Sequence, residues 1–237
     1  MMIVVRAHYL EEFSLLDALI PAAGLATRMR GIPKFLLPCD NSYTTLIELH
    51  ISQLLEQCET IWIPTRPELV LLLDSIGLAQ DRVVILPMQT ENMTQTVQKV
   101  LQISKQEYFQ LVMPDTYFFG EKPYALLDPE PAIADLACWK IRDDQKGKLG
   151  QVLITDNKVQ EMKDKDPDCL FEHSWGALSF SRKLLSFANT TDPHIGYAVR
   201  SALSSGMTIS AKVMSGEYYD CGTPSEYLNM LENVIQK

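Results

Sequence analysis

The sequence predicts an α/β protein: a Rossmann-like three-layer α/β/α sandwich with a mixed, mostly parallel central sheet and a small β-rich part in its second half. In the first half, short apolar segments alternate four times with segments of helical spacing, as is typical of parallel strands joined by helices. From about residue 131 the pattern changes to strands. The chain has 237 residues, 46% hydrophobic and 22% charged, which is ordinary for a globular protein with a sizeable core. We expect one domain over residues 17–237, preceded by an N-terminal extension over residues 1–16.

The elements of the first half follow from local signals. Residues 18–20 form an apolar run that predicts a strand, and a loop of small residues follows over 21–26. Thr45 and Glu48 have the spacing of a capping box, and apolar residues up to Cys58 follow at helical spacing. The remaining segments are, in order, a strand over 60–63, a helix over 67–76, a strand over 82–86, a helix over 93–103 and a strand over 109–113.

The second half is predicted to contain strands and then helices. Asp156-Asn157 is a two-residue hairpin signal between two strands. The run from Thr223 to Glu226 supplies an N-cap, a proline in the first turn and a first-turn carboxylate for the final helix. The other segments are strands over 132–141, 151–155, 158–163 and 175–180, helices over 181–187 and 194–204, and strands over 207–213 and 217–219.

Composition and charge exclude several classes of function. A formal net charge of −9 argues against broad binding of nucleic acid or acidic membranes, so any anion site must be local. The five cysteines are widely spaced without a C-x-x-C pair, which predicts reduced thiols in a cytosol. The early apolar run is too short, and too closely followed by charges, for a signal peptide or membrane anchor. We therefore expect a cytoplasmic protein with no nucleic-acid and no membrane partner.

The segment from Ala18 to Pro38 carries the strongest functional signal. It runs a buried strand into a loop of small residues, whose backbone N–H groups can approach an anion closely. Arg28, Arg30 and Lys34 bring three positive charges to the same place. The pattern predicts a local site for a triphosphate.

The same segment resembles the signature of the sugar-phosphate nucleotidylyltransferases: an apolar strand, A-A-G-x-G-T-R-M, a short spacer, P-K and an apolar L-x-P. The resemblance implies two catalytic cations, Arg28 and Lys34, that neutralise the departing pyrophosphate, and leaves Arg30 as a surface charge. Ala26 stands where the family carries its second glycine, so the loop is expected to lie further from the nucleotide or to adopt a different turn. The implied nucleotide-binding residues are Ala22, Ala23, Gly24, Leu25, Ala26, Thr27 and, from a later stretch, Gln89.

Two aspartates that follow apolar strands predict a magnesium site. Asp115 follows the strand over 109–113, and Asp220 precedes a C-G-T-P run. Two carboxylates facing one cleft suit Mg²⁺, which keeps waters and substrate phosphate in its other positions. The alternative is that Asp220 caps its turn or the last helix and that Asp115 is a plain loop residue. The family resemblance favours the metal, since these enzymes place one metal-binding aspartate after an early strand and another in a D-x-G-T-P-like element.

The resemblance also implies a site for a sugar phosphate. Asp164-Lys165 stands for the family's acidic–lysine pair, with Asp166 in place of the proline that follows it, and the assignment of the phosphate-holding lysine stays open between Lys165 and Lys163. Gly176 lies in a segment that resembles the glycine-bearing strand of the sugar site.

Residues 89–96 stand in the place of the family's element that reads the base. In this base-reading stretch Asn92 replaces a glycine and is expected to tolerate a positive φ.

Together these elements imply a magnesium-dependent nucleotidylyltransferase. It would join an NTP to a sugar 1-phosphate by in-line attack on the α-phosphate, giving an NDP-sugar and pyrophosphate, with the β-rich part binding the sugar. Two alternatives stay open: a cytidylyltransferase that acts on a non-sugar phosphate such as phosphocholine, and a non-catalytic regulatory subunit that binds a nucleotide-sugar. The base, the acceptor and the oligomeric state, a homo-oligomer included, are not specified by the sequence.

Overall fold

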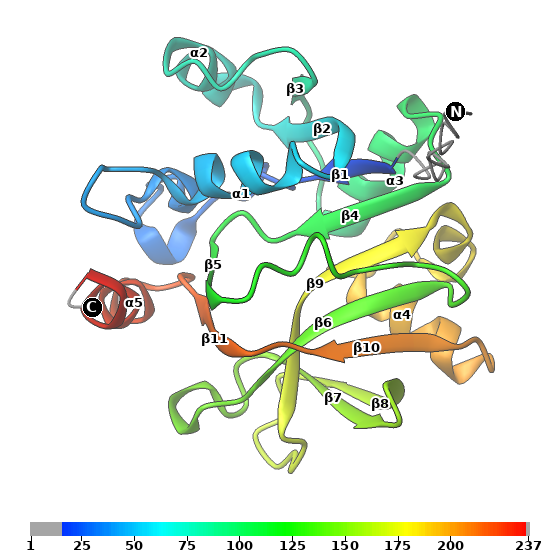
Figure 1. The fold of residues 1–237 in the computed structure, drawn as a ribbon. Helices are drawn as coiled ribbons and strands as arrows, with labels where there is room; N and C mark the ends of the chain where they lie inside the picture. The colour runs from blue at the N-terminus through cyan, green and yellow to red at the C-terminus, as the bar shows by residue number, and fades with distance from the viewer. Residues whose placement is uncertain (1–15, 236–237) are drawn as a thin grey trace, which may run out of the picture.

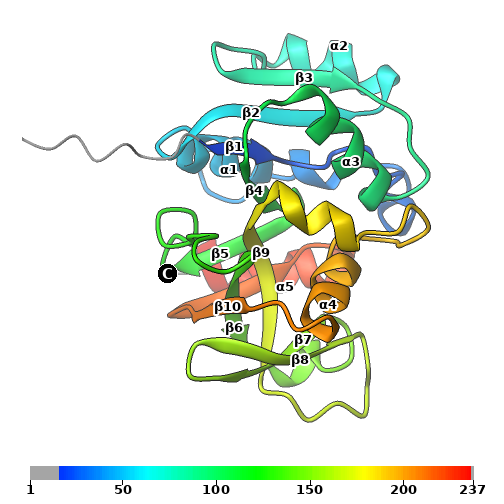
Figure 2. The same ribbon diagram turned by 90° about the vertical axis from the view of Figure 1, so that its right-hand side faces the viewer.

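A nine-stranded mixed sheet in the order β3-β2-β1-β4-β9-β6-β10-β8-β7 organises the molecule (Figures 1 and 2). The computed structural model describes residues 16–235. The strands of this sheet are β1 (Leu16–Leu19), β2 (Cys58–Thr65), β3 (Val83–Pro87), β4 (Tyr108–Val112), β6 (Ala134–Lys140), β7 (Gly150–Thr155), β8 (Lys158–Asp164), β9 (His173–Ser181) and β10 (Ile209–Val213). A second, two-stranded sheet pairs β5 (Thr116–Gly120) with β11 (Gly216–Asp220).

Helices cover both faces of the sheet. The α-helices are α1 (Leu46–Leu54), α2 (Pro67–Ser75), α3 (Met93–Ile103), α4 (Gly196–Ser204) and α5 (Pro224–Ile235), and short 3₁₀ helices lie at Thr27–Met29, Lys34–Leu36, Asp143–Gln145 and Arg182–Phe187. Figure 2 shows α3 and α4 on one face and α1 behind the sheet on the other. Ile51 of α1 and Leu73 of α2 belong to one buried core, whereas Val100 of α3 and Val199 of α4 belong to another. The α/β class and the layered, mixed-sheet architecture predicted from the sequence are confirmed.

The strand directions divide the sheet into two halves. The pairs β3–β2, β2–β1 and β1–β4 are parallel, as the alternation predicts. Strand β9 then pairs antiparallel with both β4 and β6, and β8 pairs antiparallel with β7 and β10. The antiparallel share is therefore larger than the sequence predicts, because β9 enters between β4 and β6 in the reverse direction.

Local capping signals place several element boundaries correctly. Glu48 and Thr45 form the expected capping box at the start of α1, with the Thr45 N–H donating to Glu48 Oε2 at 2.8 Å. Thr223 Oγ1 lies 3.0 Å from Glu226 Oε2 at the start of α5. Cys58, expected on the helix, instead begins β2, because α1 ends at Leu54.

Strand β5 was not predicted, because the apolar run before it was expected to end in a loop at Pro114-Asp115. In the structure Thr116 pairs directly with Asp220 across the two-stranded sheet. This pairing brings the two aspartates to neighbouring positions. The expected extension over residues 1–16 lies outside the described residues except for Leu16, which begins β1.

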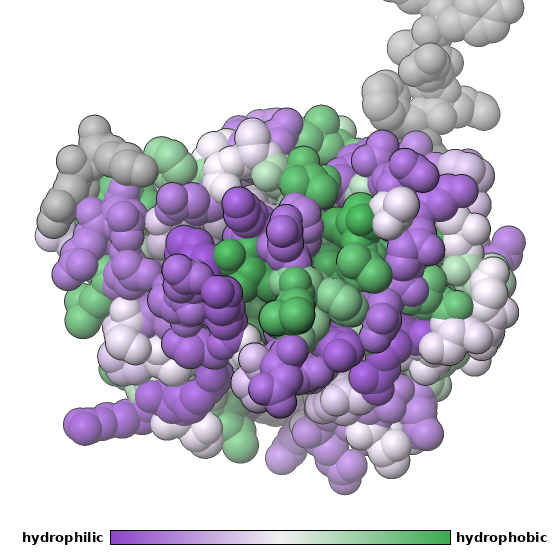
Figure 3. Space-filling view, turned by 90° about the horizontal axis from the view of Figure 1, so that it is seen from below, coloured by the Kyte–Doolittle hydropathy of each residue, from purple (hydrophilic) through white to green (hydrophobic). Residues whose placement is uncertain are grey.

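Hydrophilic residues cover most of the face that Figure 3 shows. Seen from the end where β7 and β8 lie, hydrophobic residues gather near the middle within a rim of hydrophilic ones (Figure 3). Leu153 of β7 is 40% exposed and Val213 of β10 is 51% exposed. None of the helices between residues 16 and 235 has the length and apolar composition that crossing a bilayer requires.

Candidate active site

Two cavities adjoin beside the carboxyl ends of β1 and β4. The loop cavity, about 180 Å³, is lined by the small-residue loop, Lys34 and Asp115. The central cavity, about 210 Å³, is lined by Arg28, Met93, Met113, Asp115, Thr116, Lys148, Leu149, Gly150, Asp164, Lys165, Trp175, Gly176, His194, Tyr218 and Asp220. Because both cavities share Met93, Met113 and Asp115, their contents would meet at Asp115.

The small-residue loop presents free backbone groups. Ala22 anchors it, since its N–H donates to the Pro64 carbonyl at 2.9 Å and its carbonyl accepts from Thr65 Oγ1 at 3.2 Å. Beyond this anchor, Ala23, Gly24 and Leu25 form no hydrogen bond with any described residue. Successive unpaired N–H groups of this kind can receive an anion.

The loop turns at Ala26, which adopts a left-handed conformation. Its φ is 49° and its ψ is 37°, immediately before the 3₁₀ helix that carries Arg28. A residue with a Cβ is strained there, whereas glycine is not. The departure from the family's glycine therefore leaves the chain with a left-handed turn at an alanine.

We expect Ala26→Gly to raise the free energy of unfolding by about 1 kcal/mol, because it removes the left-handed strain. Chemical denaturation measures the change. Ala23→Gly is the matched control, since Ala23 is not among the residues with positive φ and glycine there only adds freedom to the unfolded chain. Equal destabilisation by both substitutions would contradict the expectation.

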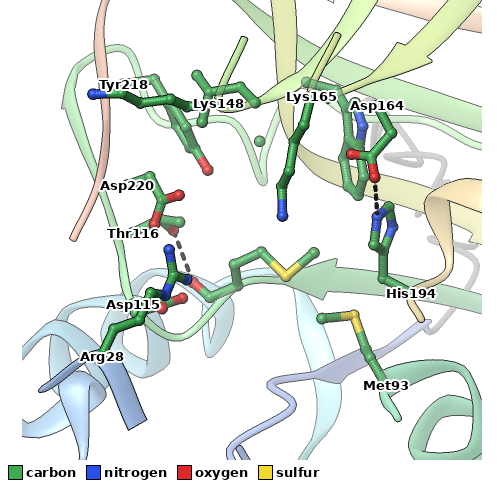
Figure 4. Close-up of a pocket in the computed structure, with 15 residues that line it drawn as sticks. Arg28, Met93, Asp115, Thr116, Lys148, Asp164, Lys165, His194, Tyr218 and Asp220 are labelled. Carbon is green, nitrogen blue, oxygen red and sulfur yellow. Dashed lines mark hydrogen bonds and ion pairs between the residues drawn. The ribbon is translucent and has the colours of Figure 1, made fainter. Parts of the chain in front are cut away.

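Asp115, Asp220 and Arg28 gather at one side of the central cavity (Figure 4), and Lys34 approaches Asp115 from the loop cavity. Lys34 Nζ lies 2.6 Å from Asp115 Oδ2. The Cys221 N–H donates to the Asp115 carbonyl at 2.8 Å, so the backbones of the two aspartate segments are tied together. A Cβ on Gly222 would lie 2.8 Å from Asp220 Oδ1 and 3.2 Å from Arg28 Nη2, which places the guanidinium and the carboxylate against the same glycine.

The surroundings of Asp220 disfavour its charged form. Burial, followed by the charges of Asp115 and Glu226, raises the pKa of Asp220 from 3.8 to about 6, although Lys34 and Arg28 act in the opposite direction. A divalent cation bound there would favour the charged carboxylate. Among residues 16–235 no group of three or more histidine, cysteine or acidic side chains could hold a metal ion. Two carboxylates nevertheless fit Mg²⁺, because phosphate oxygens and waters complete its shell.

A buried histidine supports the strand that follows Asp115. His50 on α1 is fully buried, and its Nε2 donates to the Thr116 carbonyl at 2.9 Å. Its Nδ1 must then accept from the Tyr124 hydroxyl, 2.7 Å away. Burial lowers the pKa of His50 to about 4, so the ring stays neutral and fixes this one arrangement of hydrogen bonds.

The opposite side of the central cavity is formed by polar residues of the second half. Figure 4 shows Lys165 between the aspartate side and a pair formed by Asp164 and His194. His194 Nε2 lies 3.3 Å from Asp164 Oδ2, and this hydrogen bond holds the pKa of Asp164 below its usual value. Lys163 lines neither of the two cavities and instead lies 3.3 Å from Asp166 Oδ2. Lys165 is thus the lysine of the pair that faces the cavity.

Sequence reasoning did not identify Lys148, His194 or Tyr218 as residues of this site. Lys148 precedes β7, His194 precedes α4, and Tyr218 lies on β11. No local motif marks them. The pairing of β7 with β8 brings Lys148 to the cavity, the pairing of β11 with β5 brings Tyr218, and the contact with Asp164 of β8 holds His194 there.

Gly176 lies at the wall of the cavity for a steric reason. A Cβ at this position would lie 2.4 Å from Tyr218 Cε2 and 3.0 Å from Trp139 Cζ3. Neither ring can move easily, because Tyr218 and Trp139 pack with Phe118 in a buried aromatic cluster. The glycine therefore allows Tyr218 to lie against β9.

We expect Gly176→Ala to lower the free energy of unfolding by about 2 kcal/mol through overpacking. Gly24→Ala is the control for stability, since a Cβ on Gly24 would meet nothing within 4 Å. Thermal unfolding compares the two variants. An alanine at 176 that unfolds with the parent protein would show that the aromatic cluster accommodates the methyl group.

The base-reading stretch carries two expectations, a positive φ at Asn92 and a nucleotide contact at Gln89. Asn92 has a φ of −152°, so its expected positive φ is wrong; it is the N-cap of α3 and accepts from the Gln95 N–H at 2.9 Å. Gln89 is exposed after β3, and its carbonyl accepts from Lys99 Nζ at 3.2 Å. Gln89 lines neither the loop cavity nor the central cavity.

Comparisons with known proteins agree on one family and fold. The model of the MobA-like NTP transferase domain matches residues 18–154. A search of curated proteins found no match.

Several solved structures have the same fold. A candidate glucose-1-phosphate thymidylyltransferase from Bacillus anthracis, in complex with sucrose, has a TM-score of 0.79 at 17% identity and covers 92% of this chain and 95% of its own. The inositol-1-phosphate CTP transferase from T. maritima has a TM-score of 0.76 at 15% identity, covering 93% and 96%. A UDP-glucose pyrophosphorylase complexed with UDP-glucose has a TM-score of 0.75 at 17% identity, covering 92% and 98%. At these identities the likeness shows a shared fold.

Proposed function

The chain belongs to the family of MobA-like NTP transferase domains, and we propose that it joins the nucleotidyl group of an NTP to a sugar 1-phosphate, giving an NDP-sugar and pyrophosphate. The family membership confirms the resemblance to nucleotidyltransferases that the loop segment carries. We propose in addition that the acceptor is a sugar 1-phosphate and that the reaction uses Mg²⁺.

The meeting of two cavities at Asp115 carries the proposal. The loop cavity has the free N–H groups and the Lys34 cation that suit the phosphates of an NTP. The central cavity has Lys165 and Lys148, which suit an acceptor phosphate, beside polar groups that suit hydroxyls. Two substrates placed in adjoining cavities would bring their phosphates together at the aspartates, as in-line transfer requires.

The reaction depends on positioning and charge neutralisation. A phosphate-monoester oxygen of the acceptor is already anionic at neutral pH, so it needs no general base to attack the α-phosphorus. As its bond to phosphorus forms, the bond to the β-phosphate oxygen breaks and pyrophosphate leaves with the electron pair. Arg28 and Lys34 neutralise the leaving charge, and Lys165 orients the attacking phosphate. Asp115 and Asp220 would hold Mg²⁺, which supplies further positive charge at the α-phosphate.

Pyrophosphate release tests the proposal and separates the acceptor classes. The enzyme is incubated with each common NTP and with glucose 1-phosphate, inositol 1-phosphate or phosphocholine, with and without Mg²⁺. We expect release that requires Mg²⁺ and glucose 1-phosphate, whereas release with inositol 1-phosphate alone would make the acceptor a cyclitol phosphate instead of a sugar phosphate. Release with phosphocholine alone would replace the acceptor class, and binding of a nucleotide-sugar without any release would favour a regulatory subunit.

A further inference from the structure

Lys165 adopts a strained backbone conformation at the end of β8. Its φ is 52°, in the left-handed region that residues with a Cβ rarely occupy. Such a conformation persists only where neighbouring groups hold it, and it is common at functional sites. The contacts that hold it therefore bear on where its side chain lies in the central cavity.

Gln151 supplies two of these contacts from β7. Its Nε2 donates to the Asp166 carbonyl at 2.7 Å, and its Oε1 accepts from the Asp166 N–H at 3.1 Å. The Gln151 side chain is only 2% exposed. A buried amide is costly unless both of its ends are paired, and here both ends pair with the residue next to Lys165.

Two further contacts complete the support. The Lys165 N–H donates to the Leu149 carbonyl at 3.1 Å. At the next loop, a Cβ on Gly147 would lie 2.8 Å from the Pro167 Cα, so the segment before β7 packs directly on the segment after Lys165. The peptide units on both sides of Lys165 are thus bound to the segment from Gly147 to Gln151.

We infer that Gln151 is a positioning residue that acts through Lys165, holding it in the conformation from which its ammonium group reaches the central cavity. The inference rests on the proposed role of Lys165 in binding the acceptor phosphate. Gln151 contacts Asp166 and is not among the residues that line the central cavity, so it acts at one remove from substrate. The resemblance places a proline at position 166. A proline there has no backbone N–H and could not donate to Gln151 Oε1.

The test compares Gln151→Met with the parent enzyme, using the best acceptor of the panel above. The methionine keeps the length of the side chain and removes both hydrogen bonds. We expect the KM for the acceptor to rise about tenfold, because the ammonium group is displaced, while the KM for the NTP stays within about twofold. A parallel rise in both KM values, or no change in either, would overturn the inference.

A double-mutant cycle with Lys165→Met separates positioning from general damage. If Gln151 acts through Lys165, then Gln151→Met has no further effect on the acceptor kcat/KM once Lys165 is methionine. Val152→Ala is the control, since Val152 is a fully buried neighbour on β7 and its truncation loosens the core. Additive effects of Gln151→Met and Lys165→Met would contradict the inference.

Amide hydrogen exchange gives a readout that does not depend on activity. We expect the Asp166 amide to exchange at least about ten times faster in Gln151→Met than in Val152→Ala, because only the former loses its acceptor. Equal rates in the two variants would refute the positioning role. If the parent enzyme releases no pyrophosphate, the proposed function is refuted. The exchange rates of the Asp166 amide would still decide whether Gln151 holds the segment at Lys165.

Discussion

Asp220→Asn is expected to lower the rate of nucleotidyl transfer by a hundredfold or more and, in the same protein, to raise the free energy of unfolding at pH 8. The loss of rate follows because the amide cannot replace a carboxylate at the proposed Mg²⁺ site. The gain in stability follows because the charged carboxylate is unfavourable in the metal-free protein. Pyrophosphate release and denaturant unfolding measure the two effects.

The pH dependence of the stability change follows from the pKa of Asp220. Burial and the neighbouring Asp115 raise that pKa from 3.8 to about 6, so the folded protein holds a proton that the unfolded chain releases. The carboxyl group's contribution to stability is therefore fully present below about pH 4 and is lost as the pH rises through about 6. We expect Asp220→Asn to gain about 3 kcal/mol at pH 8 and almost nothing at pH 4.

Asp164→Asn provides a comparison of opposite sign. A hydrogen bond with His194 holds the pKa of Asp164 below its usual value, so its carboxylate stabilises the folded protein above the ordinary pKa and loses that effect as the pH falls. This variant should therefore be less stable than the parent at pH 8. If Asp220→Asn were also less stable than the parent at pH 8, the charge of the Asp220 carboxylate would not destabilise the folded protein.

Elements that depend on neighbouring residues were predictable from the sequence. The capping box at Thr45 and the N-cap at Thr223 each lie within four residues of chain, and the helix α3 was predicted over its full observed range. Strand β5 was missed because its partner β11 lies about a hundred residues further along the chain. Its aromatic residues are stabilised by that pairing and by the cluster around Trp139, neither of which has a local signal.

The site was predictable where a motif is continuous and unpredictable where strands assemble it. Arg28 and Asp115 were identified from short segments, and the structure brings both to the central cavity. The choice between Lys163 and Lys165 stayed open because both lie at the end of the same strand, two residues apart. Only the left-handed turn at Lys165, held by Gln151, gives the two lysines different surroundings.

Arg28→Met is expected to lower kcat by a hundredfold or more, because it removes the cation that is proposed to neutralise the departing pyrophosphate. Among the described residues no carboxylate oxygen lies within 4 Å of a guanidinium nitrogen of Arg28, so its charge is not committed to an ion pair. Arg28→Lys should retain part of the rate, since it keeps the charge and loses the planar guanidinium. The KM for the acceptor should change little, because Lys165 is the residue proposed to bind that substrate.

Arg30→Met is the matched control for Arg28→Met, since it removes the same charge from the same loop. Arg30 is exposed and lines neither cavity. The activity of Arg30→Met is therefore expected to stay within about twofold of the parent enzyme. The Arg28 charge also lowers the pKa of Asp220, so Arg28→Met should move the pH at which metal-dependent activity appears upward, whereas Arg30→Met should not. Full activity in a folded Arg28→Met protein would exclude a role of Arg28 in the reaction. Equal losses of activity in Arg28→Met and Arg30→Met would show that the loss comes from the lower positive charge of the segment and not from Arg28 itself.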